Sequence, residues 1–119
     1  PHSGLGCAQL ENLDRYVADK RETAACYAEF FKGKEDITFF TEPADCKSNY
    51  WLNAVVLKDK AAQLDFLEYT NDHGVMTRPV WELMNRLPMF EHCETDGLEN
   101  TEWLADRVVN IPSSVRLDK

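Results

Sequence analysis

The sequence is short of positive charge. Its 13 lysines and arginines are outnumbered by 21 aspartates and glutamates, so the 119 residues carry a formal net charge of −8. Nucleic acids and anionic membrane surfaces are bound through basic patches. We therefore expect neither nucleic acid nor a membrane as a partner, while a local anion site stays compatible with this balance.

The sequence also lacks long apolar runs, clustered glycines and paired cysteines. No stretch approaches the roughly 20 apolar residues of a transmembrane helix, and no charged-then-apolar leader opens the chain. The five glycines are scattered and form no glycine-rich phosphate loop. Cys7, Cys26, Cys46 and Cys93 show no CxxC pair. These absences favour a cytoplasmic protein with free thiols.

Metal ligation and carboxylate catalysis find little support. A zinc site needs three or four converging ligands, and the only close pair of candidates is His92–Cys93, whose members are adjacent and rarely ligate together. We therefore expect no metal. Acidic residues gather between positions 91 and 102, but this segment has few apolar neighbours to raise a carboxylate pKa. A solvated surface is favoured over a hydrolase that uses these carboxylates.

The residues that are present predict one α+β domain. Hydrophobic residues make up 44 % of the chain, enough for a core. Periodicity and capping signals predict helices over 6–31, 60–72 and 101–107, and strands over 37–40, 49–57, 75–78 and 108–111. A parallel crossover between strands and antiparallel pairing both stay open. The pattern corresponds to one small sheet flanked by helices.

Three of these elements carry specific expectations. The first helix would be roughly 39 Å long, so one end is expected to lie against something absent. Lys20 and Arg21 interrupt its apolar stripe, which suggests that its central turn is less covered. The strand over 49–57 is apolar on both faces and is expected to be central and covered on both sides. The helix over 60–72 is predicted to turn inward Ala61, Leu64 and Leu67.

Arg78 is the residue most suggestive of binding. Pro79 cannot donate a ladder hydrogen bond and is expected to end the strand, which places the guanidinium where the chain turns. A planar fork of donors suits a carboxylate or another anion. An ion pair with one of the many acidic residues is favoured on residue physics alone. The three tryptophans are interpreted as core or interface aromatics, and Asn49 and Asn85 as pocket-lining or, more commonly, capping residues.

Three stretches of this chain match, in order and spacing, the sequence pattern of a known protein family. They are Leu5–Asp14 followed by Arg21 and Tyr27; Ser48–Leu52 followed by Leu57–Asp59; and Gly74–Trp81 with Leu87–Phe90, Glu102–Leu104 and Asn110–Ser114. Together they resemble the C-terminal small domain of DegT/DnrJ/StrS-type nucleotide-sugar aminotransferases. Arg78–Trp81 and Asn110–Ser114 are most similar to the branch that aminates 4-keto-6-deoxy sugars for surface polysaccharides.

The resemblance implies a pyridoxal 5′-phosphate (PLP) enzyme of fold type I. In such enzymes a large domain holds the cofactor, and a small, mostly antiparallel α+β C-terminal domain closes over the substrate. The reaction would move an amino group, usually from glutamate, onto a nucleotide-linked keto sugar. The full-length enzyme is expected to be a homodimer.

Only the small domain is matched by the resemblance. Residues 5–119 are assigned to it, and residues 1–4 to a vector or loop remnant. No lysine here replaces the Schiff-base lysine of the large domain, so this segment alone is expected to be inactive and to bind no PLP. The lysines in question are Lys20, Lys32, Lys34, Lys47, Lys58, Lys60 and Lys119.

The resemblance also ranks the substrate-binding candidates. Arg78 matches the family's arginine before the aromatic turn and comes first, then Asn49 and Tyr50, then Asn85 and Trp81. Many members have a histidine where this chain has Asn85, which leaves the sugar and the nucleotide open. No residue of this chain is expected to be catalytic. The runner-up interpretation is a stand-alone, non-catalytic binding domain that shares the fold.

Overall fold

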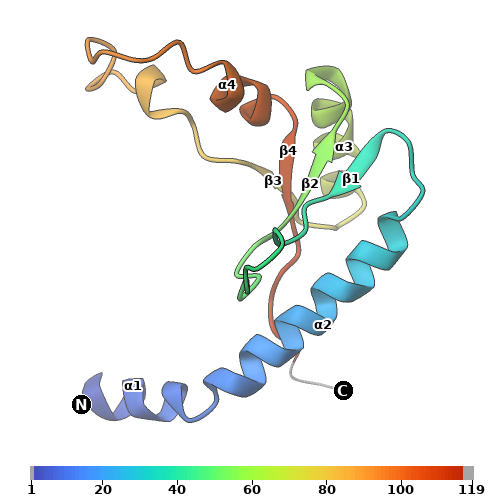
Figure 1. Cartoon of the computed structure of the whole chain (residues 1–119), viewed down its shortest axis with the longest axis vertical. Helices are drawn as coiled ribbons and strands as arrows, with labels where there is room; N and C mark the ends of the chain where they lie inside the picture. Colours follow the sequence, from blue (N-terminus) through green and yellow to red (C-terminus); the bar gives the residue numbers. More distant parts are fainter. Residues whose placement is uncertain (1, 117–119) are drawn as a thin grey trace.

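A four-stranded antiparallel sheet with the order β1-β2-β4-β3 is at the centre of the computed structural model, which describes residues 2–116 (Figure 1). The strands are β1 (Ile37–Phe39), β2 (Asn53–Leu57), β3 (Arg78–Pro79) and β4 (Val108–Ile111). Every strand pair is antiparallel, so the parallel crossover does not occur. The predicted α+β class, with a small antiparallel sheet and helices, is confirmed.

The core gathers on one face of this sheet. Val55 of β2 and Val109 of β4 are register partners and are both completely buried. Against this face pack Phe31 of α2 and Phe66 of α3. The residues of the opposite face, among them Val56, stay partly exposed. The expectation that this strand is covered on both sides was therefore wrong. The open face of the strand also carries apolar residues, so the sequence lacks the alternation of apolar and polar residues that marks a half-buried strand.

The predicted single N-terminal helix is two helices, α1 (His2–Leu10) and α2 (Leu13–Phe31). At the break, the Asn12 side chain donates to the carbonyl of Ala8 at 2.9 Å, while its backbone N–H donates to Gln9 instead. An asparagine side chain that competes for a helical acceptor favours such an interruption. Residues 2–4, interpreted as a remnant, form the first turn of α1, and their origin stays a prediction. Residues 1 and 117–119 lie outside the described part.

The middle of α2 is covered, contrary to expectation, and polar contacts cover it. The Lys20 ammonium donates to the carbonyls of Trp51 and Ser113, from segments before β2 and after β4. Arg21 bonds Glu42 in the loop between β1 and β2. The two cations that interrupt the apolar stripe therefore fasten loops to the helix.

The helix α3 (Lys60–Asp72) has the predicted bounds. Asp59 caps it by accepting from the N–H of Ala62 at 2.8 Å. Of the three residues predicted to face inward, Leu67 packs against the core, whereas Ala61 and Leu64 are exposed. Gln63, which was not predicted, is fully buried. The Gln63 amide donates to the carbonyls of Ala105 and Val108 at 2.9 Å each, and these bonds replace apolar contact at that position.

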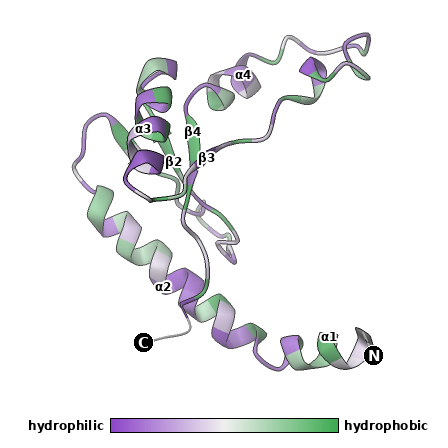
Figure 2. Ribbon diagram, turned by 180° about the vertical axis from the view of Figure 1, so that it is seen from behind, coloured by the Kyte–Doolittle hydropathy of each residue, from purple (hydrophilic) through white to green (hydrophobic). Residues whose placement is uncertain are grey.

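Residues 80–98 form an arm that leaves the sheet, contains the short 3₁₀ helix η1 (Met84–Arg86) and returns into α4 (Glu99–Ala105). Figure 2 shows apolar residues on this arm and on α1, both away from the sheet. Leu5, Leu10, Met84 and Met89 are each at least 60 % exposed. Exposed apolar side chains in such number indicate surfaces meant for contact.

Candidate functional site

A hollow of about 440 Å³ opens beside the edge strand β3. Arg78 and Pro79 contribute from β3, Asn110 and Ile111 from β4, and Met76, Trp81 and Leu52 from the flanking loops. Pro79 was expected to end the strand, yet it pairs with Val109. An edge strand tolerates proline because its outward side needs no N–H donor.

Arg78 lies exposed in this hollow, where its Nη2 makes a weak contact with the sulfur of Met76 at 3.6 Å. Among residues 2–116, no carboxylate lies within ion-pair distance of its guanidinium. The alternative of an internal ion pair is therefore not observed. The planar fork of donors is left available to an anion or a carboxylate.

Trp81, which lines this hollow, contacts the ring of Trp51. Their ring centroids are 6.2 Å apart, and the planes are tilted by 30°. They are 70 % and 65 % exposed, so the core interpretation was wrong for both. Trp103 is also half exposed, with the Arg107 guanidinium 4.5 Å above its ring.

Asn49 and Tyr50 shape the loop before β2 and do not line the hollow. The Asn49 side-chain oxygen accepts from the N–H of Trp51 at 3.0 Å, which is a local turn. Tyr50 has φ +45°, stacks on Phe39 and accepts from the N–H of Glu42 at 3.1 Å. Their binding roles stay predictions, and what the structure shows is that they shape the loop that carries Trp51, whose ring contacts Trp81 at the edge of the hollow.

Glu42 holds this loop closed against α2. Its two carboxylate oxygens accept from the two terminal nitrogens of Arg21 at 2.9 and 2.6 Å, and one accepts from the N–H of Ser48 at 2.6 Å. The Arg21 hydrogen bond, followed by that from Ser48, lowers the pKa of Glu42 to about 2. The same pairing raises the pKa of Arg21. A bidentate pair of this kind fixes the loop in one geometry.

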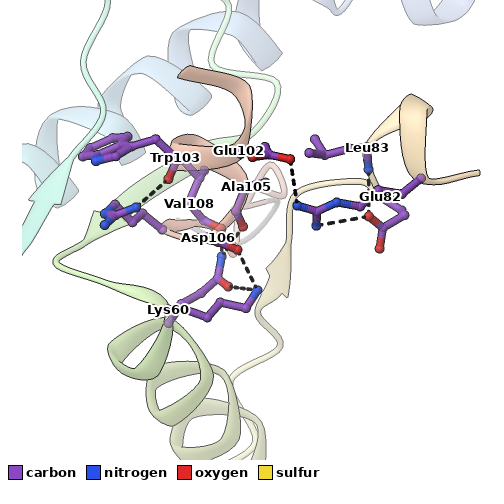
Figure 3. Close-up of polar contacts among 11 residues, drawn as sticks. Lys60, Glu82, Leu83, Glu102, Trp103, Ala105, Asp106 and Val108 are labelled. Atoms are coloured by element: carbon purple, nitrogen blue, oxygen red, sulfur yellow. Dashed lines mark hydrogen bonds and ion pairs between the residues drawn. The ribbon is translucent and has the colours of Figure 1, made fainter. Parts of the chain in front are cut away.

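Asn85 belongs to a second hollow, also of about 440 Å³, which lies between the two halves of the arm, at residues 82–85 and 90–98, and the first turn of α4. The arm is tied to α4 by Arg86, which lies 3.7 Å from both Glu82 and Glu102 (Figure 3). In the same view Lys60 lies 3.5 Å from Asp106, where α3 meets the end of α4. These pairs are exposed and contribute little to stability each. Asn85 is therefore separated from the hollow that holds Arg78.

Residue reasoning missed Asn110 as a wall of the first hollow and Asn53 as a buried polar group. Asn110 alternates with the buried Val109 and Ile111, which could have placed it on the open face. Asn53 is 1 % exposed, and both polar atoms of its side chain have no partner within the described residues. Its backbone N–H donates to the Ser113 hydroxyl at 2.7 Å.

Residues 2–116 do not by themselves fit a PLP site. The Lys20 ammonium is engaged by two carbonyls, and the other lysines within residues 2–116 are exposed. Lys32 and Lys34 line a small hollow, but the C-terminal end of α2 is there, and its partial negative charge disfavours a phosphate.

In the described part of the chain, no three His, Cys, Asp or Glu side chains gather as a metal site. Nor does that part contain a helix long and apolar enough to cross a membrane.

Two curated relatives align along most of the chain. EpsN of Bacillus subtilis (strain 168), whose name provisionally assigns it to the pyridoxal phosphate-dependent aminotransferases, is 28 % identical over 115 residues. GDP-perosamine synthase of Vibrio cholerae is 25 % identical over 114 residues. Each alignment covers 93 % of this chain, but only 30 % and 31 % of the relatives. The chain thus spans about a third of their length.

Solved structures share the fold. PseC of Helicobacter pylori, an aminotransferase involved in the biosynthesis of pseudoaminic acid, superposes with a TM-score of 0.87 at 19 % identity, over 98 % of this chain and 32 % of its own. The GDP-4-keto-6-deoxy-D-mannose-3-dehydratase of E. coli, solved with bound hydrated PLP, gives 0.75 at 18 % identity, over 93 % and 30 %. The model of the DegT/DnrJ/EryC1/StrS aminotransferase family matches residues 2–119. Because this match runs along almost the whole sequence, the chain belongs to the DegT/DnrJ/EryC1/StrS aminotransferase family.

Proposed function

We propose that this chain is the C-terminal small domain of a PLP-dependent sugar aminotransferase. The full-length enzyme would transfer an amino group from glutamate to a nucleotide-linked 4-keto-6-deoxy sugar in surface polysaccharide biosynthesis. The observation that carries this proposal is the guanidinium of Arg78, which faces the hollow without a carboxylate partner in the described chain. Membership of the aminotransferase family supplies the class of reaction.

In this proposal the segment contributes substrate contacts and no catalytic residue. Arg78 and Trp81 would face the substrate from the first hollow, and Asn85 from the second. Asn49 and Tyr50 would act by shaping the loop that carries Trp51. PLP, when bound, supplies the electron sink for amino transfer, and its lysine would come from a large domain. We further propose a cytoplasmic homodimer for the full-length enzyme, and no activity for this segment alone.

The exposed apolar residues of α1 and the start of α2 agree with this arrangement. Leu5 and Leu10 of α1 and Leu13 at the start of α2 are between 48 % and 67 % exposed, and this end of the chain extends away from the sheet (Figure 1). A large domain packed there would remove this apolar surface from water.

The proposal is tested on the polypeptide encoded by the whole reading frame. PLP is added to that protein and to this 119-residue chain, both are reduced with borohydride, and mass spectrometry locates the modified lysines. One modified lysine upstream of Pro1, together with glutamate-dependent amination of a nucleotide keto sugar, is expected. Scattered labelling in both proteins would refute the aminotransferase and favour the stand-alone binding domain.

A further inference from the structure

Two adjacent tryptophans lie open to solvent beside Arg78. Trp81, at 70 %, is the most exposed of the large hydrophobic side chains in the described chain, and Trp51 is 65 % exposed. They come from segments 30 residues apart and contact each other at a centroid distance of 6.2 Å. An indole buries more apolar area than almost any side chain, so two neighbouring indoles left in water mark an interaction surface.

The pair is held in place before any ligand arrives. Lys20 donates to the carbonyl of Trp51 at 3.3 Å, and Asn49 accepts from the N–H of the same residue. Trp81 lies two residues after Pro79, the last residue of the edge strand β3, and the proline ring restricts the backbone there. A surface whose backbone is fixed in this way loses little conformational entropy on binding.

The surroundings of the pair select the chemistry of the ligand. Arg78 lines the hollow together with Trp81, and no carboxylate pairs with it among residues 2–116, although the protein carries a net charge of −8. A purely apolar partner would bury this cation without a counter-charge, which is costly. A ligand with both a planar ring and an anionic group satisfies the indoles and the guanidinium together.

We propose that the Trp51–Trp81 pair stacks against the base of a nucleoside diphosphate, while Arg78 receives the diphosphate. Stacking of a base on an indole tolerates any base, because every base has a π-face. The guanidinium can form two parallel hydrogen bonds to phosphate oxygens. This inference rests on the proposed function, since it names the nucleotide as the part of the substrate held by this hollow.

The test uses GDP, UDP and inorganic diphosphate as probes, titrated calorimetrically into this chain. Both nucleotides should bind at least about 10-fold more tightly than inorganic diphosphate, in line with the cost of removing a stacked ring. Trp81→Leu should abolish that difference, whereas Arg78→Gln should weaken all three probes. Trp103→Leu is the matched control, because this exposed tryptophan lies outside the hollow. Circular dichroism verifies that each variant is folded.

Three outcomes would overturn the inference: no binding of either nucleotide, equal affinity for nucleotides and inorganic diphosphate, or an equal loss in Trp103→Leu. The lysine-trapping experiment separates this inference from the proposed function. A trapped upstream lysine with nucleotide affinity that ignores Trp81→Leu would leave the aminotransferase standing and reject the base site. Nucleotide binding that depends on Trp81, without a trapped lysine, would support the base site and reject the aminotransferase.

Discussion

Arg78 and Asn110 are direct register partners on the antiparallel strands β3 and β4. Cross-strand partners project from the same face of a sheet, and here that is the face opposite the core. The neighbouring pair, Pro79 and Val109, points to the other side, where Val109 is completely buried. One strand step therefore separates Arg78 and Asn110, on the open face, from Val109 in the core.

This register predicts that Arg78 can be changed with little effect on stability. Arg78→Lys keeps the charge but loses the planar fork, so affinity for a diphosphate should fall roughly 10-fold, the value of about one charge-assisted hydrogen bond. The free energy of unfolding in urea should stay within about 0.5 kcal/mol, because the side chain is exposed. Arg107→Lys, outside the hollow, should leave the affinity for diphosphate unchanged in the same titrations. A large loss of stability in Arg78→Lys would mean that the guanidinium supports the fold.

Sequence reasoning located elements well where local signals were strong. The helix over 60–72 is bounded by the Asp59 cap and by Gly74 at φ +76°, and β4 is a β-branched run before Pro112. It failed where tertiary contacts decide. The buried face of α3 is set by Gln63, whose partners lie 42 and 45 residues away.

The same distinction applies to the candidate site. Arg78 and Trp81 are close in sequence and do share a hollow. Asn110 joins them only through the register of β3 on β4, which no local pattern encodes. Asn49 and Tyr50 were ranked as binding residues by the family resemblance, but their side chains hydrogen-bond within the loop before β2.

One-sided burial of the sheet predicts unequal costs for two adjacent valines. Val55→Ala removes methyl groups from a completely buried position and should cost about 2–3 kcal/mol in unfolding free energy. Val56→Ala, on the partly exposed face, should cost less than about 1 kcal/mol. Urea denaturation of the two variants measures the difference. Equal costs would show that the open face is covered in solution.

Glu42 predicts a specific acid dependence of stability. Its pKa is about 2 in the folded state, below its ordinary value of 4.5, because Arg21 and Ser48 hydrogen-bond the charged form. A lowered folded-state pKa gives stability that is fully present above the unfolded pKa and is lost as the pH falls through the folded one. Between pH 4.5 and pH 2, the wild type should therefore lose more stability than Glu42→Gln. Parallel losses in urea melts at these pH values would refute this role, and Glu29→Gln, at an exposed ion pair, is the control.

Gln63 is expected to be sensitive to removal of its amide. Gln63→Leu fills a similar volume with an apolar side chain but leaves the carbonyls of Ala105 and Val108 without their donor. Each unsatisfied buried acceptor costs about 1–3 kcal/mol, so the loss should exceed that of a typical substitution. Leu64→Gln, at the next and largely exposed position, should be nearly neutral in the same denaturation assay. A neutral Gln63→Leu would show that water replaces the amide.

Lys20 is predicted to position the tryptophan pair from a distance. Its ammonium joins the carbonyls of Trp51 and Ser113, so Lys20→Met should let the loop before β2 move relative to Trp81. The coupled indole transitions of the pair give an exciton signal in circular dichroism that reports their mutual geometry, and this signal should weaken. Nucleotide affinity should fall with it, whereas inorganic diphosphate, which needs only Arg78, should bind as before. Lys32→Met, at an exposed ion pair near the end of the same helix, should leave both readouts unchanged. An unaltered exciton signal in Lys20→Met would contradict the positioning role. Equal weakening of nucleotide and diphosphate binding would also contradict it, because that pattern indicates a general loss of stability.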